Sequence, residues 1–296
     1  LLQVEDPAER VAWTKRIARL FEEQLEDFDS ALKWYGKVFQ EAPTERQSAE
    51  PLLRLCDKLG RWQDVGALFA GYVADELSDE PAVLDVVRRT AEIFDLRLGD
   101  QNEARKHYRR LFDAMPDDRA VAQLYEQALE RWEAWNDLRE LVDEQAGRAI
   151  DGVAKLTLLR RSAKLDEEKL GNRSRAIGTL QEAAELDPTD RSTDAELERL
   201  ARAEELWHDL GDHLALVLSR VPDAAEREAI TLRLAEVLET KIGDVSSAID
   251  RYAEVLERSP GRREAVAALE RIAGDAEHRH RVAVVLEPVY RAAGDR

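Results

Sequence analysis

Leu98-Gly99-Asp100-Gln101-Asn102-Glu103-Ala104 is the stretch that decides the fold, because related stretches recur at intervals of about 72 residues. The corresponding residues are Leu25-Glu26-Asp27, Leu170-Gly171-Asn172 and Ile242-Gly243-Asp244. Each stretch leads to a small residue and then to a proline, which are Ala31, Ala104, Ala176 and Ala248, and Pro43, Pro116, Pro188 and Pro260. A fixed period of this kind predicts that like units stack on one another, in place of a single globular core.

The hydrophobic pattern within one copy of the repeat predicts four helices separated by short turns. In the first copy a helix begins after Asp6, a second ends at Pro43, a third covers about residues 48–59, and a fourth begins near Trp62. Four such copies predict eight hairpins and sixteen helices in a single all-α domain. The copies occupy residues 1–76, 77–149, 150–220 and 221–296.

A second marker identifies the fourth helix of each copy. Trp62-Gln63-Asp64-Val65 recurs as Trp135-Asn136-Asp137-Leu138 and as Trp207-His208-Asp209-Leu210. The last copy reads Arg279-His280-Arg281-Val282, and such divergence is typical of a terminal, capping repeat. We expect the tryptophans to pack between hairpins, with an aromatic platform for a ligand as the alternative.

These residues resemble the tetratricopeptide repeat (TPR) family in a bacterial-type tandem array. The consensus of that family places glycine, alanine, an aromatic residue and a terminal proline at the offsets of Gly99, Ala104, Tyr108 and Pro116. The resemblance is strong in the first hairpin of each copy and looser in the second. It implies a right-handed helical-hairpin solenoid of about eight TPR-like repeats, whose first helices line a concave groove that binds protein partners.

Composition narrows the class of partner. The 296 residues carry a net charge of −18, and each of the four copies is acidic, which disfavours nucleic-acid binding. No apolar stretch approaches the ~20 residues of a membrane helix, so we expect no membrane insertion and a cytoplasmic location. The opening Leu1-Leu2 suggests a fragment with any targeting signal outside it. The single cysteine, Cys56, lies in an apolar run and is expected to be buried.

Helical register predicts which side chains line the groove. Steps of four residues along the first helices, and the matching face of the third helices, give a stripe that is rich in arginine although the protein is acidic. On the first helices these residues are Arg16, Leu20, Gln24, Arg89, Ile93, Arg97, Arg161, Leu165, Lys169, Arg233, Val237 and Lys241. On the third helices they are Arg54, Gln127, Arg131, Arg199 and Arg271.

Two interpretations of this basic stripe stay open. In one, the arginines bind an acidic or phosphorylated peptide, because the planar guanidinium group matches carboxylate and phosphate oxygens. In the other, they brace neighbouring helices through ion pairs with the nearby acids Glu23, Glu50, Asp57, Glu130 and Glu168. Repetition in every copy favours bracing, since stacking geometry recurs while ligand contacts need not. The apolar Leu20, Ile93, Leu165 and Val237 argue against the carboxylate clamp that some members of the family use.

Motifs for catalysis are missing from the sequence, which has no phosphate loop, dinucleotide fingerprint, nucleophile elbow or zinc-protease helix. His208, Asp209, Asp212 and His213 do not share one helical face, and neither do His278 and His280, so we expect no metal or cofactor. The prediction is a non-catalytic scaffold or adaptor that holds a segment of a partner protein. The alternatives are a regulatory or spacer array in a larger polypeptide and, from another class, a helical-repeat enzyme. The sequence does not indicate an oligomeric state.

Overall fold

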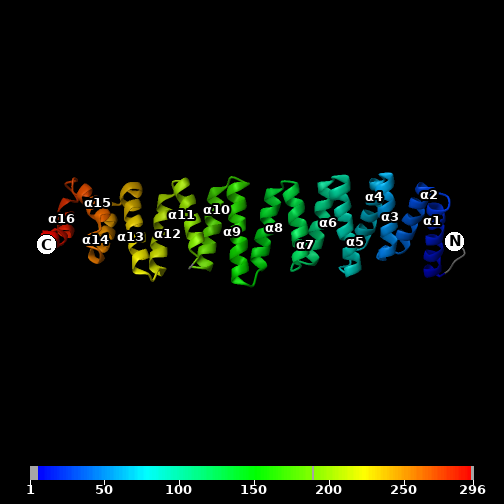
Figure 1. Cartoon of the computed structure of the whole chain (residues 1–296), viewed down its shortest axis with the longest axis horizontal. Coiled ribbons are helices and arrows are strands. Elements are labelled where there is room, and N and C mark those ends of the chain that lie inside the picture. Colours follow the sequence, from blue (N-terminus) through cyan, green and yellow to red (C-terminus); the bar gives the residue numbers. More distant parts are fainter. Residues whose placement is uncertain (1–5, 189, 295–296) are drawn as a thin grey trace. The chain divides into compact units, whose positions relative to one another are not determined.

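The computed structural model describes residues 6–188 and 190–294 of the chain. Within these ranges it contains sixteen α-helices and two π-helical segments, and no strand. The chain divides into two compact units, Leu1–Leu138 and Arg139–Arg296, which are described separately below. Within each unit, consecutive helices stand side by side (Figure 1).

The N-terminal unit contains the first two copies of the repeat, up to the start of α8. Its elements are α1 (Pro7–Glu23), α2 (Phe28–Glu41), α3 (Arg46–Leu59), α4 (Trp62–Asp75), α5 (Pro81–Glu92), η1 (Ile93–Leu98), α6 (Gln101–Ala114) and α7 (Arg119–Arg131). Helix α8 (Trp135–Arg148) begins in this unit and continues in the next. The helices that were predicted to begin at Pro7 and near Trp62, and to end before Pro43, are all present.

The C-terminal unit repeats the same order of helices. Its further elements are α9 (Gly152–Glu168), α10 (Arg173–Leu186), α11 (Arg191–Ala203), α12 (Trp207–Arg220), α13 (Ala224–Val237), η2 (Leu238–Ile242), α14 (Val245–Arg258), α15 (Arg263–Ile272) and α16 (Arg279–Gly294). The predicted boundaries between copies fall in the connections before α5, α9 and α13. The described part of the chain is therefore an all-α array of helical hairpins, as predicted.

The stretch that recurs as Gly99-Asp100 makes the turn between the first and second helices of each copy, with Glu26 at a φ angle of 50° in place of the glycine in the first copy. Gly99, Gly171 and Gly243 adopt φ angles of 66°, 64° and 84°, a left-handed conformation that glycine enters without strain. The next residue caps the following helix with its side chain. Asp100 Oδ1, for example, accepts hydrogen bonds from the backbone N–H groups of Asn102 and Glu103. The motif thus ends one helix and begins the next.

Close packing of the first hairpins depends on the recurring alanines. Ala31, Ala104, Ala176 and Ala248 all have no exposed surface, which explains why a small residue recurs at this position. The second helices end shortly before the recurring prolines, because proline cannot continue the hydrogen-bonding ladder. Cys56 is buried as predicted, and burial raises the pKa of its thiol to about 11.

Replacing Glu205 by glycine is expected to raise the free energy of unfolding by about 0.5–1 kcal/mol. Glu133 and Glu205 adopt φ angles of 54° and 56° in the turn where the first copy has Gly60 at 68°. A side chain strains this left-handed conformation, and the gain in the native state exceeds the greater freedom of glycine in the unfolded chain. Chemical unfolding of Glu205→Gly, with Gly60→Glu as the opposite control, measures the effect. A loss of stability in Glu205→Gly would contradict it.

Candidate functional site

An acidic residue near the end of the first helix joins this helix to the third helix in each copy. These acids are Glu22, Asp95, Glu167 and Glu239, and each forms an ion pair with an arginine of the third helix of its own copy. The arginines are Arg54, Arg131, Arg199 and Arg271. We call each acid with its partners an interhelix brace. Four of the predicted groove arginines therefore hold helices together.

Two of these ion pairs are bidentate, with two hydrogen bonds from one guanidinium group to one carboxylate. Arg199 donates from Nη1 and Nη2 to the two carboxylate oxygens of Glu167, at 2.8 and 2.6 Å. Arg271 donates to Glu239 from Nε at 3.0 Å and from Nη2 at 2.8 Å. Two parallel charge-assisted hydrogen bonds fix the orientation of both side chains.

A tyrosine of the second helix completes the brace in three of the four copies. The hydroxyl groups of Tyr35, Tyr108 and Tyr252 donate to Glu22, Asp95 and Glu239 at 2.9, 3.1 and 2.9 Å. Burial and the hydrogen bond to Glu22 raise the pKa of Tyr35 to about 12, so this hydroxyl remains a donor at neutral pH. In the third copy the equivalent residue is Leu180, which has no hydroxyl to donate.

The acids that the sequence interpretation assigned to the braces are wrong in two copies. It named Glu23 and Glu168, whereas the structure uses Glu22 and Glu167, one position earlier. One residue rotates a side chain by about 100° around a helix, which turns Glu23 and Glu168 towards solvent. Asp57 does form one of the expected pairs, with Arg97 at 3.1 Å.

Other predicted groove residues pair with acids or aromatic rings of the same or a nearby helix. Arg89 donates to Asp85 at 2.8 Å on its own helix, and Arg233 donates to Glu198 of α11 at 2.8 Å. Arg16 lies over the ring of Trp13, at 5.5 Å from its centroid. Gln24, Gln127 and Lys169 are exposed, and Arg161 is half-buried.

The four apolar positions in the middle of the predicted groove differ in exposure. Leu20 is 52% exposed and Leu165 is half-buried, but Ile93 and Val237 are only 4% and 3% exposed. Val237 belongs to a buried cluster with Leu214 and Leu218 of α12, where consecutive hairpins meet. The prediction that all four face a ligand therefore needs correction, because two of them are buried by packing between hairpins.

The recurring tryptophans contribute to contacts between consecutive hairpins. Trp207 packs against the buried cluster of α11 to α13, which confirms the expected core role for this residue. The Lys241 ammonium group lies over the Trp207 ring at 4.7 Å, and the Arg97 guanidinium group lies over Trp62 at the same distance. Each cation comes from the end of the next first helix, so a cation–π contact ties one copy to the following one.

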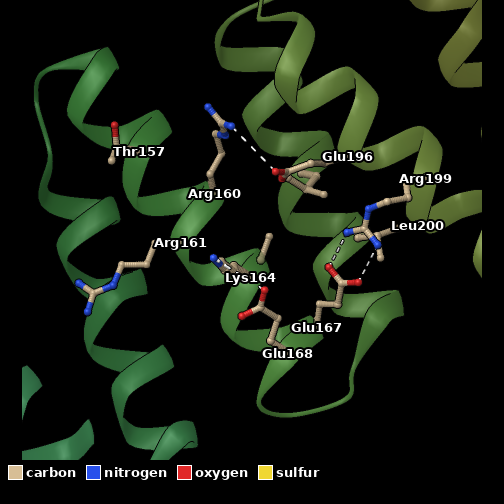
Figure 2. A pocket seen from close by; sticks show the side chains of 11 residues that line it. Thr157, Arg160, Arg161, Lys164, Glu167, Glu168, Glu196, Arg199 and Leu200 are labelled. Carbon is tan, nitrogen blue, oxygen red and sulfur yellow. Dashed lines mark hydrogen bonds and ion pairs between the residues drawn. The ribbon is translucent and has the colours of Figure 1, made fainter.

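A hollow of about 430 Å³ opens between α9 and α11 in the C-terminal unit. Its floor contains Ala163, Leu180 and Leu200, which are each at most 3% exposed, and the rest of the lining is mostly charged. Figure 2 shows Glu167 and Arg199 paired on one side, Arg160 reaching towards Glu196, and Arg161 pointing away from both pairs. The remaining lining residues are Thr157, Lys164 and Glu168. The predicted residues Arg161 and Arg199 thus meet at this hollow.

A second hollow of about 390 Å³ lies between α3 and α5 in the N-terminal unit. Its lining brings together the predicted groove residues Arg89, Ile93 and Arg97. The other lining residues are Glu50, Leu53, Asp57, Trp62, Arg88, Glu92 and Leu96. Each unit, taken by itself, therefore has a charged hollow between helices that occupy first or third positions in the repeat.

One group among the described residues has atoms close enough to approach a common cation. Carboxylate or imidazole atoms of Asp275, Glu277 and His278 lie within 4.8 Å of one another in the turn before α16. The sequence interpretation considered His278 only with His280 and missed this group, which the turn creates. Asp275 and Glu277 are exposed, and Asp275 accepts a hydrogen bond from the Glu277 backbone N–H group, as ordinary turn residues do.

Replacing Glu167 by glutamine is expected to lower the free energy of unfolding at pH 7 by roughly 0.5–1 kcal/mol. Hydrogen bonds from Arg199 hold the pKa of Glu167 below its ordinary value of 4.5. A lowered pKa stabilises the fold above pH 4.5, and this contribution is lost as the pH falls through the lowered pKa. The difference in stability between the two proteins should therefore shrink in urea unfolding as the pH falls below 4.5 and through the lowered pKa of Glu167. Glu168→Gln is the matched control, and a difference that persists at low pH would contradict the assignment.

No protein-family model matches this chain, and no curated protein matches it. Among solved structures it is similar to a kinesin light chain protein with TPR-like repeats from Podosopora anserina, at 18% identity and a TM-score of 0.35, over 64% of this chain and 100% of that one. A tetratricopeptide repeat protein from Parabacteroides merdae matches at 10% identity and a TM-score of 0.34, over 95% and 99% of the two chains. The TPR2AB domain of yeast Sti1, solved in a complex with pHSP90, matches at 11% identity and a TM-score of 0.32, over 96% and 99%.

Identities this low transfer neither a ligand nor the role of any residue. The repeat signature, the left-handed turn at its glycine and the buried alanine are features of this chain itself. No described helix is long and apolar enough to cross a membrane. On its own residues and helix pairing, the described part of the chain is an array of TPR-like hairpins.

Proposed function

We propose that this protein is a non-catalytic interaction scaffold that holds a segment of a partner protein along its first and third helices. The observation that carries this proposal is the charged hollow between such helices in each compact unit, about 390 Å³ in one and about 430 Å³ in the other. Both hollows present guanidinium and carboxylate groups, and the N-terminal hollow adds the exposed apolar side chain of Leu96. Such a mixture suits an extended protein segment with both apolar and charged side chains.

The interhelix braces support this proposal indirectly. They place ion pairs such as Arg54 with Glu22 along the same helices, so the surface beside them is held in a fixed shape. A surface that is ordered before binding loses less conformational entropy when a partner binds. The arginines of the braces therefore position the binding surface, and the cations outside the braces are the proposed ligand contacts.

Affinity capture with crosslinking tests the scaffold. The unaltered protein is compared with Arg97→Glu/Arg160→Glu, which reverses one charge at each hollow, on the exposed Arg97 and the half-buried Arg160. Lys106→Glu/Arg251→Glu is the matched control, because it makes the same charge change on the second helices α6 and α14. We expect the first variant to lose the crosslinked partner and the control to keep it. Equal capture by both variants, with both folded by circular dichroism, would contradict the proposal.

A further inference from the structure

The third copy differs from the other three at the centre of its interhelix brace. Leu180 stands where Tyr35, Tyr108 and Tyr252 donate to the acid of the first helix. The exposed fraction of the acid's side chain changes accordingly. It is 21% for Glu167, against 11% for Glu22, 3% for Asp95 and 9% for Glu239. Loss of the tyrosine ring and hydroxyl thus leaves the third brace the most open of the four.

Two cations stand over this open brace without strong partners of their own. The closest carboxylate oxygens lie 3.5 Å from Arg160, on Asp190, and 3.7 Å from Lys164, on Glu168. These distances exceed that of a good hydrogen bond. In contrast, the Arg199 hydrogen bonds to Glu167 are 2.6–2.8 Å long. An incoming anion can therefore take up the N–H groups of Arg160 and Lys164 without breaking a hydrogen bond.

No other copy combines the loss of the tyrosine with two cations that lack a short hydrogen bond. The residues equivalent to Arg160 and Lys164 are Arg88 and Glu92 in the second copy, and Leu232 and Glu236 in the fourth. The first copy has Lys15 and Arg19, but Lys15 already donates to Glu45 at 2.7 Å and Tyr35 is present. The hollow in Figure 2 is therefore a specific departure from the repeat, and stacking alone does not explain it.

We propose that the hollow between α9 and α11 is an anion subsite that accepts the carboxylate or phosphate of an acidic or phosphorylated side chain from the bound segment. This proposal rests on the proposed scaffold function and names the chemistry of one of its contacts. Arg160 and Lys164 bind the anionic group above the floor of the hollow, where Leu180 and Leu200 are each only 1% exposed. Glu168 and Glu196 also line the hollow, 3.7 Å from Lys164 and 4.0 Å from Arg160, so an incoming anion competes with these carboxylates for the two cations. Acids farther away than about 8 Å oppose binding only weakly, because salt screens them at physiological ionic strength.

Leu180→Tyr is the decisive variant. It restores the residue of the other three copies, whose hydroxyl bonds to the equivalent acid, so we expect it to fold and to close the hollow. The probes are blocked pentapeptides that differ only in a central glutamate, phosphoserine or glutamine. Methyl NMR shifts of Leu180 and Leu200 report binding in the unaltered protein, and those of Leu200 report it in Leu180→Tyr.

We expect the glutamate and phosphoserine peptides to shift both methyl signals saturably and the glutamine peptide to leave them unchanged. The peptide that binds more tightly shows whether the natural ligand group is a carboxylate or a phosphate. Leu180→Tyr should abolish the shift of Leu200. Arg160→Gln and Lys164→Gln should each weaken binding about fivefold to tenfold, corresponding to the loss of one charged contact. Lys155→Gln, on the same helix outside the hollow, should change nothing.

The subsite is overturned if the glutamine peptide binds as well as the acidic ones, or if folded Leu180→Tyr still binds them. If Leu180→Tyr does not fold, the two glutamine variants decide, and full binding by both overturns it. A different result would reject the proposed scaffold function. A captured partner that Leu180→Tyr retains rejects the subsite alone, whereas peptide binding without any captured partner rejects the scaffold and keeps the subsite.

Discussion

Replacing Asp166 by alanine is expected to lower the free energy of unfolding by about 3 kcal/mol. Asp166 of α9 has no exposed surface and accepts a hydrogen bond at 3.0 Å from Arg139 of α8, which is itself buried. Without the carboxylate, a buried guanidinium group loses its buried partner, and such losses typically amount to 3–5 kcal/mol. Arg139 keeps its ion pair with Asp143, which places the expected effect at the lower end of that range.

The contact between α4 and α5 corresponds to the contact between α8 and α9, and it suggests a control variant for this prediction. Gly66 occupies the position of Arg139 at the joint of α4 and α5, and it lies against Phe94, which occupies the position of Asp166. The third copy has thus replaced an apolar contact by an ion pair. Burial raises the pKa of Asp166 even though Arg139 opposes the shift, which indicates that the ion pair only partly offsets the loss of hydration.

We therefore expect Arg139→Gly/Asp166→Phe to be much more stable than Asp166→Ala alone. Replacement of both members of a buried pair by apolar groups is often close to neutral. Urea unfolding with amide hydrogen exchange of α8 and α9 measures the effect, since a repeat array can unfold in parts. If the double variant were no more stable than Asp166→Ala, the account of this joint would be wrong.

Replacing Phe69 by alanine is expected to lower the free energy of unfolding by about 3–5 kcal/mol. Phe69 of α4 and Phe39 of α2 are both fully buried, and their rings stack with centroids 4.2 Å apart. The pair joins the first and second hairpins of the N-terminal unit. Alanine removes this aromatic contact and leaves a cavity that the rigid helices fill only in part.

Thermal and urea unfolding measure this effect, with Leu77→Ala as a control. Leu77 is 79% exposed, so its replacement should change stability by less than about 0.5 kcal/mol. Phe69→Leu keeps much of the volume and should lose less than Phe69→Ala. Equal losses for the buried and the exposed positions would contradict the role of the Phe39–Phe69 pair in joining the hairpins.

Sequence alone determined the helical hairpins, because their signals are local. A glycine that adopts a left-handed turn, an aspartate that caps a helix and a proline that ends one act within a few residues of their own position. The buried alanine recurs in every copy because two helices of the hairpin approach each other closely at that position. The cap and the proline recur in all four copies and the glycine in three, so the period could be read without a structure.

Tertiary structure alone decided how these hairpins pair their charges and where their surfaces open. The π-helical segments η1 and η2 end the first helices of the second and fourth copies, and Gly66 allows the η1 residue Leu98 to approach α4 closely. Ile93 and Val237 are buried by contacts between hairpins that a helical pattern does not specify. Arginine pairs equally well with acids one residue apart in sequence, and only packing selects Glu167 over Glu168. The hollow beside Leu180 likewise depends on three helices that meet in space.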